Sequence, residues 1–160
     1  MNLFKTCSLT VIATLTLAGC AFTSVTPGMS QQEVIARNGA PTRVLPVGNG
    51  TRLQYSGQPL GRWAFMVDLD ASGRVVNARQ VLDPREFAAI VTGQWTRGDM
   101  EREFGRPASV DHVASWAGDI MTYRWRDGIQ NMFFWAYLDG ANVVQRTGQA
   151  MEIPFEMRDK

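Results

Sequence analysis

Met29-Ser30-Gln31-Gln32-Glu33-Val34 has the pattern of a helix start, and Trp95-Thr96-Arg97-Gly98-Asp99-Met100 repeats that pattern later in the chain. In each stretch a hydroxyl can accept a hydrogen bond from the third helical amide, and the acidic residue there can reach back to the cap. This capping box, flanked by two apolar residues, predicts a helix in both places. Both helices are expected to end at a glycine in the left-handed conformation followed by a proline, in Gly39-Ala40-Pro41 and Gly105-Arg106-Pro107.

Short runs that alternate apolar and polar residues follow each predicted helix, as is typical of strands with one buried face. Asp127-Gly128 and Asp139-Gly140 add strong hairpin signals, because a type I′ turn needs a positive φ at both central residues. The predicted strands span residues 42–46, 52–56, 63–69 and 75–82 after the first helix, and residues 108–114, 120–126, 129–138 and 143–147 after the second.

The recurrence of helix and strands predicts a duplicated α+β fold of two tandem units. Each unit has one or two short helices followed by a four-stranded antiparallel meander. The first unit covers residues 30–82, and the second, with a C-terminal tail, covers residues 83–160. The second unit gains a helix because Asp83-Pro84-Arg85-Glu86 has an Asp cap and a Pro at the first helical position. Gly93 is expected to end this helix, and its expected apolar stripe is Phe87, Ile90 and Val91.

The second predicted sheet is rich in aromatic residues. Phe133-Phe134-Trp135 is apolar on both faces, so its strand is expected to be central or to lie under the helices. Successive side chains of a strand point to opposite faces of the sheet. In the strand predicted at 120–126, one face therefore carries Met121, Tyr123 and Trp125, and the other carries Thr122, Arg124 and Arg126.

The N-terminal segment has the features of a bacterial export signal in the expected order: a charge at Lys5, an apolar run and a small-residue box. The box, Leu17-Ala18-Gly19-Cys20, resembles a lipobox. The resemblance implies that residues 1–19 are a lipoprotein signal peptide, that Cys20 is acylated, with palmitate among its acyl chains, and that residues 20–29 tether the fold to a membrane. The alternative is an ordinary cleaved signal peptide in which Cys20 is incidental.

Composition argues against several classes of function. The 16 Lys and Arg side chains nearly balance the 15 Asp and Glu side chains, and no basic cluster stands out, so a nucleic-acid partner is not expected. One histidine, with Cys20 the only cysteine after processing, predicts neither a zinc site nor a disulfide. No cofactor motif is present. A calcium site at Asp68 and Asp70 is an alternative, although aspartate is ordinary beside a turn.

Asp111-His112, with Ser109 or Ser115, has the residue types of a catalytic triad. Adjacent strand residues point to opposite faces, so Asp111 cannot orient His112 if both lie in a strand. The sequence therefore predicts no catalytic residue, and an enzyme ranks behind a binding protein.

The stretch GMSQQEVIARNGAPT, at residues 28–42, resembles the Gly-Met-Thr-x-x-Glu-Val-x-x-x-x-Gly-x-Pro signature of the BamE/SmpA/OmlA outer-membrane lipoproteins. Those proteins are small helix-plus-sheet subunits of the machinery that folds β-barrels into the outer membrane. FAAIVTGQWTRGDMEREFGRPA, at residues 87–108, is a looser copy. Two such units in tandem are similar in layout to the β-lactamase inhibitor protein. The assembly factors usually have one unit, and the inhibitor has disulfides that this chain cannot form.

Trp116 is the first candidate for a protein-binding residue. It lies in Ser115-Trp116-Ala117-Gly118-Asp119, a predicted loop in which an exposed Trp has no packing role. Trp, Tyr and Arg dominate binding hot spots, and Arg124 and Arg126 are the candidates for polar contacts with a partner. The alternative is that the aromatic residues of this unit serve core and sheet packing alone.

These features together predict a non-enzymatic, lipid-anchored envelope protein that binds other proteins. Ala21 follows Cys20, whereas an Asp there holds lipoproteins of enterobacteria in the inner membrane, so the expected location is the outer membrane, facing the periplasm. The resemblance implies a role in outer-membrane protein assembly or envelope integrity. The alternative is an inhibitor of a periplasmic or exported enzyme.

Overall fold

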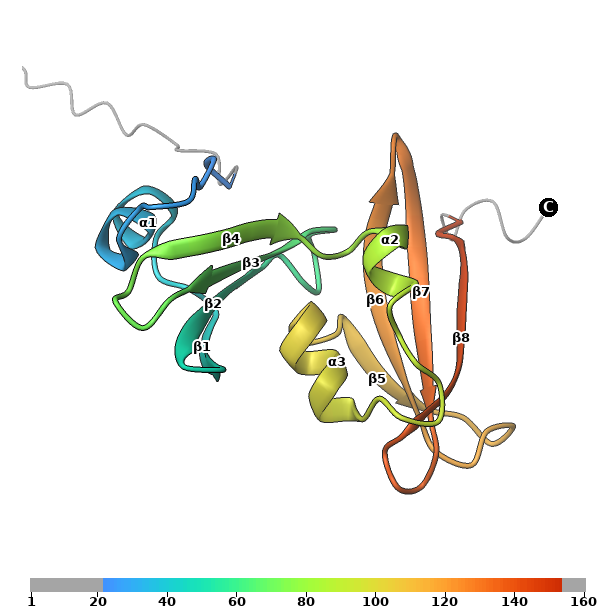
Figure 1. The fold of residues 1–160 in the computed structure, drawn as a ribbon. Helices are drawn as coiled ribbons and strands as arrows, with labels where there is room; N and C mark the ends of the chain where they lie inside the picture. The colour runs from blue at the N-terminus through green and yellow to red at the C-terminus, as the bar shows by residue number, and fades with distance from the viewer. Residues whose placement is uncertain (1–21, 154–160) are drawn as a thin grey trace, which may run out of the picture.

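The computed structural model describes residues 22–153, which form two four-stranded antiparallel sheets and three short helices (Figure 1). The α+β tandem layout is confirmed, and strands in each sheet follow chain order. None of the helices in this part of the chain is long and apolar enough to span a membrane. The first unit contains α1 (Gln31–Asn38) and sheet 1, formed by β1 (Arg43–Val47), β2 (Gly50–Ser56), β3 (Ala64–Leu69) and β4 (Val75–Gln80). The second contains α2 (Pro84–Phe87), α3 (Arg97–Phe104) and sheet 2, formed by β5 (Ser109–His112), β6 (Asp119–Asp127), β7 (Gln130–Leu138) and β8 (Val144–Met151).

Both predicted capping boxes are present. The Ser30 amide donates to the Glu33 carboxylate at 2.7 Å, and the Thr96 amide donates to the Asp99 carboxylate at 2.8 Å. The side chains of Ser30 and Thr96 accept the return hydrogen bonds from the third helical amides. The bonds from the two cap residues stabilise the charged carboxylates and so hold the pKa of Glu33 and of Asp99 below their usual values.

A matching pair of tyrosines shows how closely the units repeat each other. The Tyr55 hydroxyl donates to the carbonyl of Gly39 at 3.1 Å, and the Tyr123 hydroxyl donates to the carbonyl of Gly105 at 3.0 Å. Each hydroxyl thereby ties its sheet to the end of the preceding helix. Each unit also has a β-bulge at the end of its third strand. These shared features define which positions of sheet 1 and sheet 2 are equivalent.

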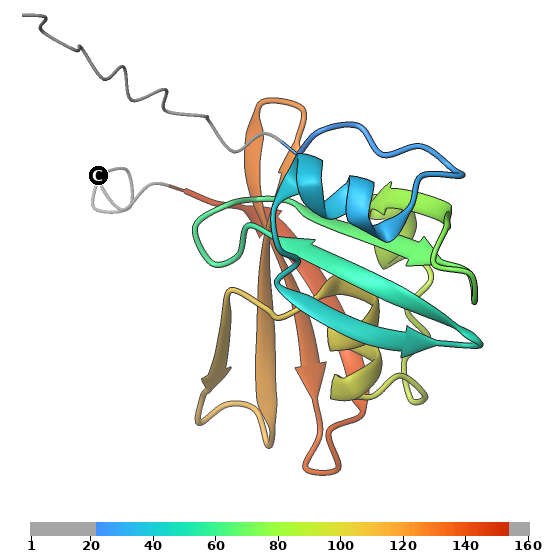
Figure 2. The ribbon, with the colours of Figure 1, turned by 90° about the vertical axis from the view of Figure 1, so that its left-hand side faces the viewer.

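The elements stack in layers. In Figure 2, α1 lies in front of sheet 1, and α3 lies between sheet 1 and sheet 2. One core lies between α1 and sheet 1; its buried members are Met29, Val34, Leu53, Tyr55, Val67, Leu69 and Val75. A larger core lies against sheet 2; among its members are Phe87, Met100, Phe104, Tyr123, Trp125, Phe134 and Leu138. Ala64 and Met66 of β3 belong to this larger core, so it joins the two units.

The helix predicted from Asp83 to Gly93 is shorter than expected. α2 ends at Phe87, and Val91, assigned to its apolar stripe, is 44% exposed. The chain leaves the helix because the Gly93 amide donates to the Val144 carbonyl at 2.7 Å, which draws the segment against β8. Backbone pairing to a neighbouring strand therefore overrides the helical pattern.

A polar joint connects the units. Arg52 of β2 is only 4% exposed, and its guanidinium donates to the Arg102 carbonyl at 3.1 Å, to Glu103 at 2.7 Å and to Asp68 at 2.5 Å. Gln54, also buried, donates to the Arg102 carbonyl at 2.9 Å. Sheet 1 thus satisfies carbonyls that the last turn of α3 leaves without helical partners. Burial disfavours the charge on Arg52, but the hydrogen bonds to Asp68 and Glu103 outweigh it and raise the pKa.

The two helix-ending glycines have a positive φ, as predicted, but not the left-handed helical conformation. Gly39 has φ 77° and ψ −172°, and Gly105 has φ 80° and ψ −173°. This extended region with positive φ is nearly confined to glycine. The predicted positive φ is therefore confirmed, and the predicted ψ is wrong, because the chain turns directly toward the following proline.

Gly105→Ala is expected to lower the free energy of unfolding by about 1–3 kcal/mol, because alanine is strained at this φ and ψ. Space is not the cause, since an added Cβ would lie 3.6 Å from the nearest atom, the Met66 Cε. Gly98→Ala is the matched control. Gly98 lies inside α3, where alanine should stabilise the helix by up to about 1 kcal/mol. Urea unfolding measures both free energies. If both variants were stabilised or both destabilised, the strain assigned to residue 105 would be contradicted.

Candidate protein-binding face

Sheet 2 has one face covered by helices and one that no described helix covers. α2 and α3 both lie on the side that faces sheet 1 (Figures 1 and 2). Directly paired residues share a face, so the strand register defines the opposite side, which we call the outer face. Among its members are Ile120, Thr122 and Arg124 of β6, Phe133, Trp135 and Tyr137 of β7, and Arg146, Gly148 and Ala150 of β8.

Trp116 packs against this outer face from the β5–β6 loop. Its indole N–H donates to the Leu138 carbonyl at 2.6 Å, and its ring meets Tyr137 edge-on at a centroid distance of 5.3 Å. The guanidinium carbon of Arg146 lies 4.0 Å from the Tyr137 ring centroid and 5.3 Å from that of Trp116. The expectation of an exposed loop Trp without a packing role is therefore wrong, because a hydrogen bond and a ring contact half-bury it.

Two further aromatic side chains extend the cluster along β7. The rings of Phe133 and Trp135 lie 5.8 Å apart, and both residues are half-buried. Gly148 is paired with Trp135, and a Cβ added to Gly148 would lie 3.8 Å from the indole. Glycine at this position therefore leaves the flank of Trp135 uncovered. We call Trp116, Phe133, Trp135, Tyr137 and Arg146 the aromatic cluster.

Arg124 lies on the predicted face, but its charge is used within the protein. Its guanidinium forms an ion pair with Glu152 and donates to the Pro59 carbonyl at 3.1 Å. Glu152 also pairs with Arg62 at 2.7 Å. Burial raises the pKa of Glu152, but the hydrogen bonds from Arg124 and Arg62 outweigh it and lower the pKa overall. Arg126 is exposed at the hairpin end of the same strand.

The outer face of sheet 2 is equivalent to the face of sheet 1 that α3 covers. Given that Tyr55 is equivalent to Tyr123, Arg52 and Gln54 correspond to Ile120 and Thr122. On sheet 1 these positions bind the end of α3. On sheet 2 the same positions carry Ile120 and Thr122, which are each only 8% exposed, and no described helix lies on this face (Figures 1 and 2). The outer face is therefore a different kind of surface, dominated by aromatic rings.

The binding residues predicted from the sequence do not include Phe133, Trp135, Tyr137 or Arg146. β7 is central in sheet 2, as predicted, and Phe134 lies under the helices. Alternation along β7 places its neighbours on the other face. The alternation of side chains along β7 therefore groups Phe133, Trp135 and Tyr137 on one face. It does not say that this face is uncovered until the position of the helices is known.

The histidine and the aspartates considered for catalysis or metal binding contact other side chains and do not form a shared site. The Ser109 hydroxyl donates to Asp111 at 2.8 Å, while His112 faces Asp119 at an Nδ1–Oδ1 distance of 3.5 Å. Asp68 pairs with Arg52 and Arg79 at the polar joint between the units. In residues 22–153 no group of three or more potential ligands is placed to hold a metal ion. Cys20 lies outside the described residues.

No protein-family model matches the chain, and no curated protein matches it either. Among solved structures, the chain is similar to a DUF4309 family protein (YjgB) from Bacillus subtilis subsp. subtilis str. 168. The two share 13% identity with a TM-score of 0.33, over 77% of this chain and 78% of that chain. A likeness of this size transfers no function.

Proposed function

We propose that this protein is a non-enzymatic protein-binding module, lipid-anchored through Cys20 in the outer membrane and facing the periplasm, and that its outer face binds the partner. The observation that carries the proposal is the aromatic cluster. It lies on the face equivalent to the one that α3 covers on sheet 1, and no described helix lies on it (Figures 1 and 2).

The chemistry of the cluster supports protein binding. Trp, Tyr and Arg are the side chains that most often supply hot spots, and here they contact one another on a rigid sheet. The net charge is only +1, so long-range electrostatic steering contributes little to association. Affinity is therefore expected to come from the burial of aromatic surface.

Two partner classes follow from the resemblances. The capping-box signature shared with BamE/SmpA/OmlA lipoproteins supports a role in outer-membrane protein assembly or envelope integrity. The tandem arrangement of two sheets, which single-unit assembly factors lack, instead favours an inhibitor of a periplasmic or exported enzyme, similar in layout to the β-lactamase inhibitor protein.

Site-specific photocrosslinking in intact cells tests the proposal. A photoreactive phenylalanine at Arg146 places the probe within the aromatic cluster. Asn77, the equivalent position of sheet 1, is the matched control. Both residues are exposed, and each follows the β-bulge of its own sheet. Crosslinks to barrel-assembly subunits from position 146 support the first class, and crosslinks to a hydrolase support the second. Equal crosslinking from both positions would contradict a role for the outer face.

Cys20→Ala is expected to abolish lipid attachment, because the thioether anchor needs the Cys20 sulfur. Labelled palmitate should be incorporated into the wild-type protein and not into the variant, which should remain uncleaved or mislocalised. Thr23→Ala, close to the same site, is the control and should retain the label. Labelling of the Cys20 variant at the wild-type level would refute the anchor.

A further inference from the structure

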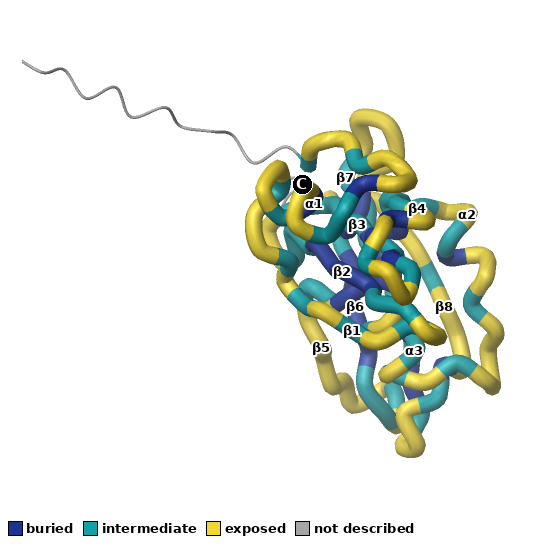
Figure 3. The backbone as a smooth tube through the Cα atoms, turned by 60° about the vertical axis from the view of Figure 1, so that its left-hand side comes forward, coloured by how far each residue is buried: buried dark blue, intermediate teal, exposed yellow. Residues whose placement is uncertain are grey.

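β8 is an edge strand of sheet 2, and only its first residue is covered along the open side. The Val144 amide donates to the Trp95 carbonyl at 2.8 Å, and the Val144 carbonyl accepts from Gly93 at 2.7 Å. Beyond this pairing the strand continues to Met151 and is mostly exposed (Figure 3). The remaining edge is therefore accessible to another chain.

The free backbone groups of this edge can be identified. The Glu152 amide donates to the Asn131 carbonyl at 2.8 Å, so residue 152 points its N–H toward β7. Backbone direction alternates along an antiparallel strand. Thr147, Gln149 and Met151 therefore direct their N–H and C=O groups away from β7. Within residues 22–153 none of these groups has a hydrogen-bond partner across the edge.

The devices that usually protect an edge are missing from this stretch. Charged residues, prolines and very short strands discourage edge pairing. β1 contains Pro46, and β5 spans only four residues. β4 carries the charged Arg79, which pairs with Asp68 and Glu86. Residues 147–151 of β8 contain no charge and no proline.

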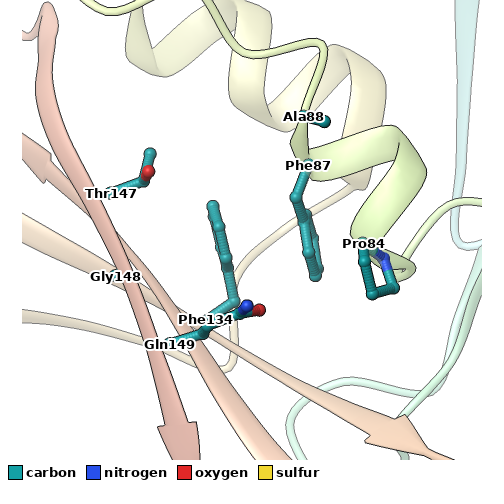
Figure 4. Close-up of a pocket in the computed structure, with 7 residues that line it drawn as sticks. All are labelled: Pro84, Phe87, Ala88, Phe134, Thr147, Gly148 and Gln149. Atoms are coloured by element: carbon teal, nitrogen blue, oxygen red, sulfur yellow. The ribbon is translucent and has the colours of Figure 1, made fainter.

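A groove runs beside this edge on the helix side of sheet 2. A cavity of about 370 Å³ lies between α2 and β8 (Figure 4). The rings of Phe87 and Phe134 stack in it with centroids 4.0 Å apart. The lining is completed by Pro84 of α2, by Ala88 directly after it, and by Thr147, Gly148 and Gln149 of β8. The lining contains no charged side chain, so the groove suits apolar groups.

We propose that the β8 edge from Thr147 to Met151 accepts an extended segment of a partner protein that has uncharged, apolar side chains at alternate positions. Only an extended chain satisfies the free backbone groups in register. Its alternate side chains would enter the groove beside Phe87. A second copy of β8 fits less well, because Thr147 and Gln149 are polar and already form the wall of the groove. This site is separate from the aromatic cluster, and binding there does not depend on it.

An acetylated and amidated peptide, Lys-Thr-Val-Thr-Val-Thr-Val-Lys, is the probe. On titration, the amides of Thr147, Gln149 and Met151 should shift in NMR spectra and exchange more slowly with solvent. Gln149→Pro removes one edge donor at a position where an edge strand tolerates proline. It should weaken peptide binding at least about fivefold, as expected for one lost hydrogen bond.

Gln149→Lys is the second variant, because a charge at the groove mouth opposes strand addition without disturbing an exposed position. Gln130→Lys makes the same change on an exposed residue of β7 away from the edge, and should bind normally. Trp135→Ala should also bind the peptide normally, which separates this site from the outer face. Absent binding, or binding unaffected by both Gln149 variants, overturns the proposal. A concentration-dependent dimer that Gln149→Pro abolishes also overturns it, because the edge then belongs to a second copy.

Discussion

Arg52→Ala should lower the free energy of unfolding by about 3 kcal/mol, the low end of the range for removing one member of a buried ion pair. The side chain of Arg52 is only 5% exposed and bonds to Asp68 and Glu103. Its loss leaves these carboxylates with weaker compensation and the Arg102 carbonyl without a donor from Arg52. Arg79 still pairs with both carboxylates at 3.3 Å, which is why the low end applies. Urea unfolding at neutral pH measures the change.

Arg79→Ala is the control for this effect. Arg79 contacts the same two carboxylates, but its side chain is 28% exposed and donates to no carbonyl of α3. Partly exposed ion pairs contribute up to about 1 kcal/mol. Arg79→Ala should therefore cost much less than Arg52→Ala. Equal losses would show that charge balance at Asp68 and Glu103 matters more than the connection between the two units.

Local features of the fold could be predicted because their causes lie within a few residues. A capping box needs only Ser30 and Glu33, or Thr96 and Asp99, and both boxes are present. The glycine-proline pairs placed the helix ends, and the alternating runs placed the strands, except that β8 continues to Met151, beyond the predicted end at residue 147. Repetition of these signals was sufficient to predict two tandem units, since each signal is complete within its own segment.

The packing of the units against each other could not be predicted, because it depends on residues distant in sequence. Nothing near Arg52 indicates that its guanidinium meets the end of α3. In the same way Arg124 of β6 is paired with Glu152, which directly follows β8. Trp116 lies in a loop, and it packs on sheet 2 because its indole donates to the Leu138 carbonyl, 22 residues away in sequence. Because its indole is bonded and packed against Tyr137, Trp116→Ala should lower stability.

Trp135→Ala should weaken binding of the partner identified by crosslinking by at least about 2 kcal/mol, which corresponds to about a thirtyfold rise in Kd. Trp135 lies mid-strand on the outer face, beside Phe133 and next to the glycine that leaves it uncovered. Its truncation removes cross-strand contacts of about 1 kcal/mol or less from the folded protein. The effect on binding should therefore exceed the effect on stability.

Trp125→Ala separates these two effects, because Trp125 belongs to the same sheet but points to the helices. It is 2% exposed and meets Phe87 edge-on at 5.6 Å. Truncation of a buried Trp costs about 3–5 kcal/mol, so this variant should lose stability first and binding only through unfolding. Thermal unfolding and titration calorimetry on both variants give the comparison. If the melting temperature of Trp135→Ala is as low as that of Trp125→Ala, the Trp135 ring serves packing. If Trp135→Ala binds the partner with wild-type affinity, the partner does not use the outer face.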